Sequence, residues 1–372
     1  MNKPKLFLLS PMLHQGGFER VCVTTARVMA DVFDISIVIF DDADIAYDIS
    51  GLNIINLNLG VKNGAVAKIL NVFKRVRAYR KLLKQEKPGI SYSFGITANL
   101  VNSLAKVKDT KVFLGLRSYM DVWEKKKMYL FTKRGDLVVA CSKVIENEIK
   151  KDYPWAKTCT LYNLYDIDEI KRLAQEDVAD MPWNDDRKIL ISLGREDEVK
   201  CFWHMIKAFY LVHKEIPNTA LMILGDGDFG KYDGLVKALG LEDSISFAGL
   251  KKNPYKYLNK SDVYMLTSRN EGFPNALVEG MCLGLAAVAT DCMTGPREIL
   301  KDGEYGILVP TMNSEPDLNA NNCDDERLMA DKIIEILKDE NKLKEYRRLA
   351  AKRALDFSYQ AYHEEFVKMC TQ

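Results

Sequence analysis

Short apolar runs alternate along this chain with longer segments in which apolar residues recur every three or four positions. The short runs predict buried strands and the longer segments predict helices. We predict strands at residues 5–10, 35–40, 54–57, 90–94, 111–114 and 137–140, and then at 189–193, 220–224, 245–247, 263–266, 286–289 and 306–309. Helices are predicted between several of them, at 19–29, 66–85, 203–214, 232–239 and 275–283. This alternation is typical of parallel sheets with helical crossovers, so the predicted fold class is α/β.

The alternation of strands and helices is interrupted once, by an acidic segment that contains Pro182. We therefore expect two doubly wound, Rossmann-like domains at 1–164 and 188–356, joined by a linker at 165–187. The stretch 326–369 is helical by pattern, and we expect its end, within 357–372, to return to the first domain. Ligands of such sheets bind beyond the carboxyl ends of the strands. We therefore expect the active site in the cleft between the two domains.

Composition narrows the class of protein. The chain has 372 residues, of which 47% are hydrophobic and 28% are charged, as in ordinary globular proteins. No apolar stretch approaches the roughly 20 residues that cross a bilayer. Eight cysteines without a Cys-x-x-Cys pair, and only four histidines, argue against a disulfide framework and a structural zinc site. We expect a cytoplasmic protein.

Charge is divided unevenly between the halves. Residues 1–165 contain 26 Lys and Arg against 15 Asp and Glu, whereas residues 166–372 contain 27 against 37. The tract 68–87 has eight basic residues and one acid, with Leu70 and Phe73 among them, and 123–131 repeats this mixture. Such segments are either ordinary amphipathic surface helices or a patch for an anionic membrane surface or a lipid-linked pyrophosphate. A nucleic-acid partner is not expected.

The densest group of chemically useful residues lies at 268–279, after a predicted strand and at the start of a helix. Gly272 and the helix start leave backbone N–H groups available to an anion. Phosphate oxygens can sit on the amides of residues 273–276, while Glu279 can reach ribose hydroxyls and Glu271 a sugar hydroxyl. A helix N-terminus with a capping acid and no ligand would have the same pattern.

Two further candidate loops each follow the first predicted strand of a domain. Arg195 and Lys200 are two cations in the loop after the strand at 189–193, where they can neutralise a diphosphate leaving group. A solvated charged loop is the alternative. Gly16 and Gly17 open a helix after the strand at 5–10 and allow a ligand to approach the backbone, although a tight turn explains them equally well.

In this order, the motifs resemble those of the retaining glycosyltransferases of family 4, also called glycosyl transferases group 1, which have the GT-B fold. The shared features are the Gly-Gly-x-Glu-Arg sequence at 16–20, the Gly-Arg…Lys loop at 194–200, Gly-Asp-Gly at 225–227, the two glutamates at 271 and 279, and the segments 295–299 and 302–306. The resemblance spans nearly the whole chain and is strongest from 188 to 310. It implies transfer of a sugar, with retention of configuration, from a nucleotide-sugar, expected to be a UDP-sugar. The implied acceptor is a sugar or lipid-linked glycan, in surface polysaccharide or glycan assembly.

The resemblance also implies a role for each residue of the site. Arg195 and Lys200 hold the donor diphosphate, Glu271 holds the transferred sugar, and Glu279 holds the ribose. The remaining contacts come from the backbone of Phe273, Pro274 and Asn275 at the phosphates and sugar, from Gly249 and Leu250 at the base, and from Gly16 and Gly17, which close on the donor from the other domain.

Two positions depart from the family pattern. Cys201 replaces the glycine that commonly follows the lysine. Arg117 stands where relatives often carry a histidine near the reacting sugar, and an arginine can contact a phosphate or stabilise charge but cannot act as a base. We include Arg117 among the catalytic candidates.

Other functions are less well supported by the sequence. The segment 225–230 fits the Gly-x-Gly-x-x-Gly pattern of nicotinamide dehydrogenases, but it follows the second strand of its domain rather than the first. A nucleotide-sugar epimerase of similar shape, or an inactive sugar-nucleotide-binding protein, remains an alternative. The Asp-x-Asp sequences at 42–44 and 226–228 lack further acids at suitable spacing, so we expect no metal and no cofactor besides the donor.

Overall fold

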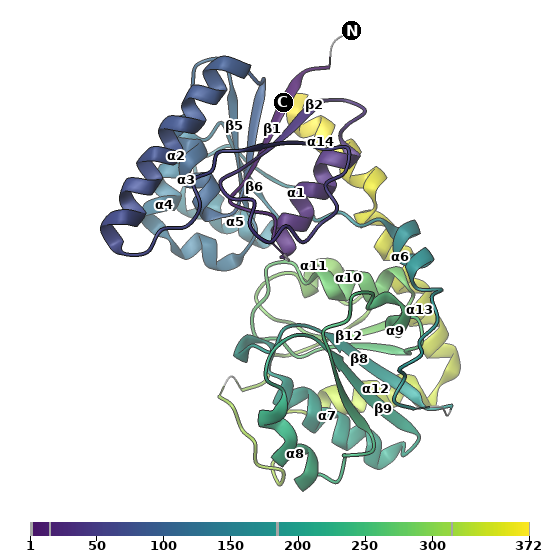
Figure 1. The fold of residues 1–372 in the computed structure, drawn as a ribbon. Helices are drawn as coiled ribbons and strands as arrows, with labels where there is room; N and C mark the ends of the chain where they lie inside the picture. Colours follow the sequence, from purple (N-terminus) through teal and green to yellow (C-terminus); the bar gives the residue numbers. More distant parts are fainter. Residues whose placement is uncertain (1–2, 15, 184–185, 314, 372) are drawn as a thin grey trace. The chain divides into compact units, whose positions relative to one another are not determined.

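The computed structural model describes residues 3–14, 16–183, 186–313 and 315–371 (Figure 1). It divides the chain into two compact units. Unit 1 comprises Met1–Leu164 and Tyr359–Gln372, and unit 2 comprises Tyr165–Ser358. Each unit is built on its own parallel sheet, and each is described separately below.

Unit 1 contains a seven-stranded parallel sheet in the order β3-β2-β1-β4-β5-β6-β7. Its strands are β1 (Lys5–Ser10), β2 (Asp34–Ile39), β3 (Asn53–Asn56), β4 (Ile90–Phe94), β5 (Lys111–Leu116), β6 (Leu137–Ala140) and β7 (Thr158–Thr160). The helices are α1 (Gly17–Val28), α2 (Ala65–Glu86), α3 (Ile96–Ala105), α4 (Lys125–Arg134), α5 (Lys143–Asp152) and α14 (Tyr359–Thr371), with a 3₁₀ turn η1 (Tyr119–Trp123).

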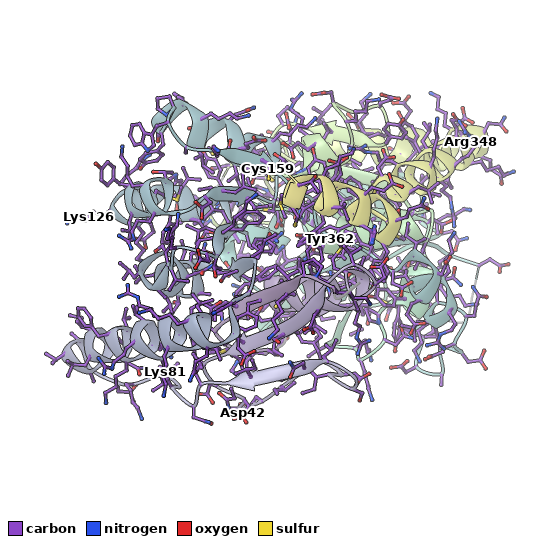
Figure 2. The ribbon with its side chains drawn as sticks, turned by 90° about the horizontal axis from the view of Figure 1, so that it is seen from above. Asp42, Lys81, Lys126, Cys159, Arg348 and Tyr362 are labelled. Atoms are coloured by element: carbon purple, nitrogen blue, oxygen red, sulfur yellow. The ribbon has the colours of Figure 1, made fainter. Side chains whose placement is uncertain are left out.

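Alternation along β1 explains how this sheet is covered on both faces. Leu6 and Leu8 pack with residues of α1 and α14, whereas Phe7 and Leu9 pack with residues of α2 and α3. The last helix is joined to α1 by a hydrogen bond of 2.8 Å between the hydroxyls of Tyr362 and Thr25. Figure 2 labels Tyr362 on this helix. The C-terminal helix is therefore part of the core of unit 1.

Unit 2 contains a six-stranded parallel sheet in the order β10-β9-β8-β11-β12-β13. Its strands are β8 (Lys188–Leu193), β9 (Thr219–Leu224), β10 (Ile245–Gly249), β11 (Val263–Leu266), β12 (Ala286–Thr290) and β13 (Ile307–Val309). The helices are α6 (Ile167–Leu173), α7 (Phe202–Glu215), α8 (Asp233–Ala238), α9 (Tyr255–Leu258), α10 (Asn275–Cys282), α11 (Pro296–Ile299), α12 (Arg327–Lys338) and α13 (Glu340–Ala354), with 3₁₀ turns η2 (Glu198–Lys200), η3 (Gly230–Tyr232) and η4 (Leu355–Phe357). One face of the sheet packs with α7, α8 and α12, and α10 and α13 contact β12.

The predicted α/β class with two doubly wound sheets is confirmed, and so is the position of most strands. The short strand β7 was missed, because three residues of the sequence Thr-Cys-Thr carry no apolar run. The segment 165–187 is not a plain linker. It contains α6, whose Ile167 and Ile170 are buried, and it belongs to unit 2.

The strand order places the ligand-binding edge of each sheet. The order reverses between β1 and β4 in unit 1 and between β8 and β11 in unit 2. Loops that leave adjacent strands in opposite directions at such a point open a crevice at the carboxyl edge. Among the described residues, none of the helices combines the length and the apolar character needed to span a bilayer.

Candidate active site

The loop after β8 turns back and places Lys200, its last residue, at the carboxyl edge of the unit 2 sheet. The Asp197 side chain caps η2 by accepting a hydrogen bond from the Val199 N–H at 3.1 Å. Cys201 then takes a left-handed conformation, with φ of 51°, at the start of α7. A glycine would adopt this conformation at lower cost. The cysteine preserves the turn and leaves Lys200 in place.

Lys200 and Glu271 form an ion pair at the point where the strand order reverses. The Lys200 Nζ lies 2.6 Å from the Glu271 Oε1, and their side chains are only 23% and 11% exposed. Ser268 Oγ donates a second hydrogen bond to the same oxygen at 2.7 Å. Two loops that lie 71 positions apart in the sequence are thus joined through residues that the motifs had singled out separately.

Side chains that the sequence analysis did not single out hold this pair of loops in place. Thr267 Oγ1 donates to the Lys200 carbonyl at 2.9 Å, and the Arg269 N–H donates to the Val199 carbonyl at 2.9 Å. The hydroxyl of Thr290 donates to the Ser268 carbonyl at 2.5 Å, and that of Thr294 donates to the Glu271 carbonyl. Hydroxyl and backbone donors therefore fix both loops before any ligand arrives, which is the kind of support that positions a charged site.

Burial and negative charge raise the pKa of neighbouring groups. Burial is the main cause of the raised pKa of Tyr264, and the charges of Glu271 and Glu279 add to it. Burial also raises the pKa of the Cys292 thiol to about 12, with a further contribution from Glu271. Because Tyr264 is influenced by both glutamates, the two carboxylates lie in one electrostatic neighbourhood, which Lys200 partly neutralises.

Glycines allow the strand ends to approach each other closely. A Cβ atom on Gly225 would stand 1.8 Å from the Gly194 carbonyl oxygen, and the Gly225 N–H donates to the Gly249 carbonyl at 3.1 Å. The Gly194 N–H in turn donates to the Leu224 carbonyl at 2.9 Å. Backbone hydrogen bonds therefore join the ends of β8, β9 and β10. The strand ends lie so close together that position 225 has no room for a side chain.

Gly225→Ala is expected to lower the free energy of unfolding by roughly 1–3 kcal/mol, as overpacking does, because backbone rather than a flexible side chain obstructs the new Cβ. Gly234→Ala in α8 is the matched control, since a Cβ there meets nothing within 4 Å. That control should be neutral or slightly stabilising. Thermal unfolding monitored by circular dichroism compares the two variants. Equal Tm values would contradict the close packing of the strand ends at Gly225.

The start of α10 carries the next group of candidates. Pro274 precedes the helix, and no side-chain hydrogen bond caps this terminus in the described structure. Phe273 is buried and packs edge-on against Phe357, and Asn275 Oδ1 accepts a hydrogen bond of 2.5 Å from the Tyr165 hydroxyl. These contacts hold the helix start in one position, so that its amide dipoles point outward from a fixed frame. Glu279, one turn into the helix, is buried.

Three other candidates of unit 2 lie at the same edge without joining the ion pair. The Arg195 side chain is 73% exposed, and its nearest carboxylate is Asp197 at 3.3 Å. Gly249 ends the edge strand β10 with φ of 69°, and Leu250 is 58% exposed. They are therefore available to a ligand, and the described structure does not tie them to Lys200 or Glu271.

The candidates of unit 1 surround the carboxyl ends of β1 and β5. Gly16 and Gly17 begin α1, and the Tyr47 hydroxyl donates to the Gly16 carbonyl at 2.6 Å. Arg117 follows β5 and donates to the Tyr92 hydroxyl at 2.5 Å and to Asn163 Oδ1 at 3.1 Å. Gln15, between the strand and the glycines, lies outside the described residues.

Glu19 is a candidate that the sequence analysis quoted without giving it a role. Its side chain is 7% exposed, and its Oε2 atom is buried without a hydrogen-bond partner among the described residues. A Cβ on Gly16 would lie 2.3 Å from that oxygen, so a larger residue there would require the carboxylate to shift. Burial raises the pKa of Glu19, against the opposing effects of its own N–H and of His14. The Gly-Gly-x-Glu spacing at 16–19 was the sequence feature that could have identified Glu19 as a site residue.

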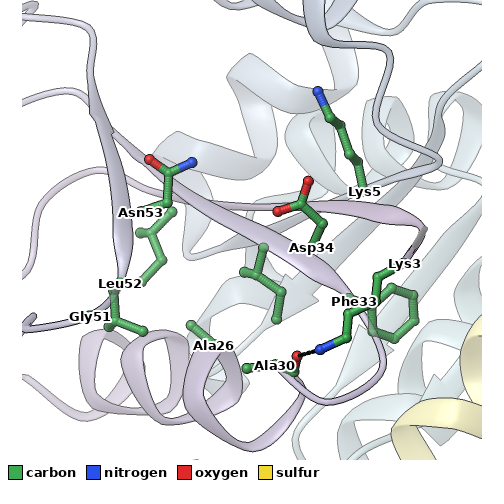
Figure 3. Close-up of a pocket in the computed structure, with 11 residues that line it drawn as sticks. Lys3, Lys5, Ala26, Ala30, Phe33, Asp34, Gly51, Leu52 and Asn53 are labelled. Carbon is green, nitrogen blue, oxygen red and sulfur yellow. Dashed lines mark hydrogen bonds between the residues drawn. The ribbon is translucent and has the colours of Figure 1, made fainter. Parts of the chain in front are cut away.

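Two further features bear on what the site can bind. Among the described residues, no group of three or more His, Cys, Asp or Glu is arranged to hold a metal ion. A hollow of about 640 Å³ lies in unit 1 and is lined by residues that include Lys5, Asp34 and Asn53 (Figure 3). Because Lys5 and Asp34 begin β1 and β2, this hollow is at the amino edge of the sheet, away from the carboxyl edge that holds the candidate residues.

The chain is similar to known glycosyltransferases. Residues 174–353 match the family Glycosyl transferases group 1. A protein of Methanocaldococcus jannaschii described as an uncharacterized glycosyltransferase is 31% identical over 336 residues, which cover 79% of this chain and 82% of that protein. The N-acetylgalactosamine-N,N'-diacetylbacillosaminyl-diphospho-undecaprenol 4-alpha-N-acetylgalactosaminyltransferase of Campylobacter jejuni is 27% identical over 373 residues, 96% of each chain. Anabaena HepE, solved in complex with UDP and glucose, has a similar fold, with a TM-score of 0.76, 18% identity and coverage of 99% of this chain and 100% of HepE.

The chain therefore belongs to the glycosyl transferases group 1 family and is a glycosyltransferase. Membership of the glycosyl transferases group 1, expected from the order of the motifs, is confirmed, and the GT-B fold expected with it agrees with the fold of HepE.

Proposed function

We propose that this glycosyltransferase transfers a sugar from a UDP-sugar to a sugar or lipid-linked glycan, with retention of anomeric configuration. We place the reaction at the cytoplasmic face of the membrane, in the assembly of a surface polysaccharide or glycan. The observation that carries the proposal is the Lys200–Glu271 pair at the reversal point of the unit 2 sheet. The name of the Campylobacter relative, which contains diphospho-undecaprenol, and the UDP bound to HepE support the choice of acceptor and donor.

The ion pair offers a way to couple donor binding to positioning of the sugar. Without donor, the ammonium of Lys200 and the hydroxyl of Ser268 satisfy one oxygen of Glu271. A diphosphate beside Lys200 competes for the same ammonium, because a charge-assisted hydrogen bond to phosphate is as strong as one to carboxylate. Glu271 then exchanges part of its bond to Lys200 for a hydroxyl of the transferred sugar.

The other candidates complete donor binding. Arg195 is exposed and can turn its planar guanidinium toward the diphosphate. The start of α10, with Phe273, Pro274 and Asn275, presents backbone amides to phosphate and sugar oxygens. Glu279 accepts hydrogen bonds from the ribose hydroxyls, and Gly249 and Leu250 lie beside the base. We propose that unit 1 binds the acceptor beside Arg117.

Retention requires the acceptor to attack from the face that the diphosphate leaves. The bond between the sugar C1 and the diphosphate oxygen breaks, the bond from C1 to the acceptor oxygen forms, and the hydroxyl proton passes to a departing phosphate oxygen. The leaving group thus serves as the base, so an arginine at position 117 is compatible with activity. Lys200 and Arg195 stabilise the charge that develops on the diphosphate.

A panel of nucleotide-sugars tests the proposal and its alternatives. Each donor is incubated with the protein and with detergent-solubilised lipid-linked saccharides, and both the nucleotide and the sugar products are measured. Release of UDP together with an extended saccharide supports a transferase. An isomerised nucleotide-sugar without UDP release would indicate an epimerase, and binding without any product would indicate an inactive protein.

Activity is expected to survive treatment with EDTA followed by gel filtration, because we propose that Lys200 and Arg195 take the place of a divalent ion at the diphosphate. Rates before and after treatment should agree within experimental error. Complete loss of activity that added magnesium or manganese restores would contradict this and would direct attention to the Asp-x-Asp segments at 42–44 and 226–228.

A further inference from the structure

Helix α2 is attached to unit 1 by one face only. Asn71, Arg75, Tyr79 and Leu83 are its buried residues and recur every four positions. Asn71 Nδ2 donates to the Gly60 carbonyl at 2.7 Å, and Arg75 Nε donates to the Leu59 carbonyl at 2.8 Å. Tyr79 and Leu83 are buried in the core beside β1. The helix is therefore held from its second turn onward by the face that these residues define.

The opposite face of the first turns of α2 is apolar and exposed. Val66, Ile69, Leu70 and Phe73 are 71%, 58%, 55% and 67% exposed. Their spacing of three and four residues places them in one stripe along the helix. Four large apolar side chains side by side on an exposed helix are unusual on the surface of a protein that has no partner there.

The same outward face becomes basic further along the helix. Continuing the spacing from Phe73 leads to Arg77, Lys81 and Lys84, which are all exposed; Figure 2 labels Lys81. None of these three forms an ion pair among the described residues, and the acid of the helix, Glu86, is paired with Lys5 at 2.7 Å. At 1.5 Å per residue, the face runs about 27 Å from Val66 to Lys84, apolar at one end and positive at the other.

We propose that α2 docks unit 1 on an anionic lipid bilayer. Val66, Ile69, Leu70 and Phe73 enter the boundary between headgroups and acyl chains, while Arg77, Lys81 and Lys84 remain at the lipid phosphates. The proposal rests on the proposed function to the extent that a lipid-linked acceptor is presented at such a surface. An anionic bilayer fits because it alone offers an apolar layer directly beneath a continuous layer of negative charge.

A protein partner or a second copy of the chain fits this face less well. Protein interfaces are depleted of lysine and of unpaired charge at their core, whereas this face carries unneutralised cations next to its apolar stripe. The second basic and aromatic segment, at 123–131, contributes less to a docking surface. Trp123 and Tyr129 are exposed there, but Met128 and Phe131 of α4 are buried, so the segment has no continuous apolar stripe like that of α2.

Sedimentation with phosphatidylcholine vesicles, with and without phosphatidylglycerol, tests the proposal on the full chain. Wild type should bind the anionic vesicles and be released as salt increases, because the lipid charge is screened over about 8–10 Å at 0.1–0.15 M salt. The Leu70→Glu/Phe73→Glu variant should bind at least tenfold more weakly even at low salt. The Arg77→Ser/Lys81→Ser/Lys84→Ser variant should lose most of the vesicle binding that is sensitive to salt.

Leu328→Glu is the matched control, because Leu328 is an exposed leucine of α12 in unit 2 with a relative exposure of 47%. It should bind vesicles as wild type does. Thermal unfolding shows whether each variant keeps its fold, which is expected because all the changed side chains are exposed. Equal vesicle binding by wild type and the apolar variant, or no binding of wild type to anionic vesicles, would overturn the proposal, as would lipid-independent dimerisation that the apolar variant abolishes.

Depth of insertion is tested with tryptophan at two positions. The emission that Phe73→Trp adds to the wild-type spectrum should be quenched by lipids brominated on the acyl chain, and the emission added by Lys84→Trp should be quenched much less. Equal quenching would contradict the orientation along the helix. Vesicle binding requires no donor, so a protein that binds vesicles but transfers no sugar would refute the proposed function alone, and active protein that ignores anionic vesicles would refute the docking alone.

Discussion

Glu271→Ala is expected to lower turnover by roughly 10- to 100-fold while leaving UDP affinity unchanged or slightly higher. The carboxylate is proposed to hold the transferred sugar, and a hydrogen bond to a charged group contributes about 1.5–3 kcal/mol. UDP lacks the transferred sugar, so its binding loses no contact with Glu271 directly. It can improve, because Lys200 Nζ is released from its 2.6 Å contact with Glu271 and becomes available to phosphate.

Isothermal titration with UDP and rates with the true donor measure the two effects separately. Glu279→Ala is the comparison, since it should weaken UDP itself through the ribose. Loss of UDP binding in Glu271→Ala with normal binding in Glu279→Ala would mean that the two roles are reversed or wrong.

Lys200→Ala is expected to weaken UDP by tenfold or more and to leave uridine affinity unchanged, because only the diphosphate needs the ammonium. The loss should exceed that of one hydrogen bond. The substitution also leaves the Glu271 carboxylate, whose side chain is 11% exposed, without its cation and facing the phosphates.

This second effect predicts a specific result for the double variant. Lys200→Ala/Glu271→Ala should bind UDP more tightly than Lys200→Ala, because it removes the unpaired carboxylate together with the lysine. Lys214→Ala changes an exposed lysine near the end of α7, the helix that follows the Lys200 loop, and should bind UDP as wild type does. Equal UDP affinity of wild type and Lys200→Ala would remove Lys200 from the diphosphate site, and a double variant no better than the single one would separate Glu271 from it.

Much of the fold was predictable because strands of a parallel sheet are buried on both faces. The apolar run at 263–266 and the helix predicted at 275–283 correspond closely to β11 (Val263–Leu266) and α10 (Asn275–Cys282). The segment 165–187 was predicted less well, because acidic residues and a proline suggested a linker. Ile167 and Ile170 are nevertheless buried in unit 2, and a helix of seven residues is too short for the spacing of its apolar residues to show this in advance.

The candidate site was predictable as a set of residues, and its contacts were not. Lys200 and Glu271 were chosen from separate motifs, and their contact depends on β8 and β11 being neighbours, which no local pattern encodes. In α2, Phe73 and Leu83 looked equivalent, but Leu83 lies on the face that packs on the sheet whereas Phe73 is exposed.

Proton NMR of a reaction with an α-linked UDP-sugar and a lipid-linked saccharide distinguishes retaining transfer from inversion and from epimerisation. We expect one UDP released for each sugar transferred, and a new anomeric signal with the small coupling of an α-linkage. A β-linked product would contradict the retaining mechanism. An isomerised UDP-sugar without release of UDP, or no product from any UDP-sugar, would contradict the proposed transfer itself.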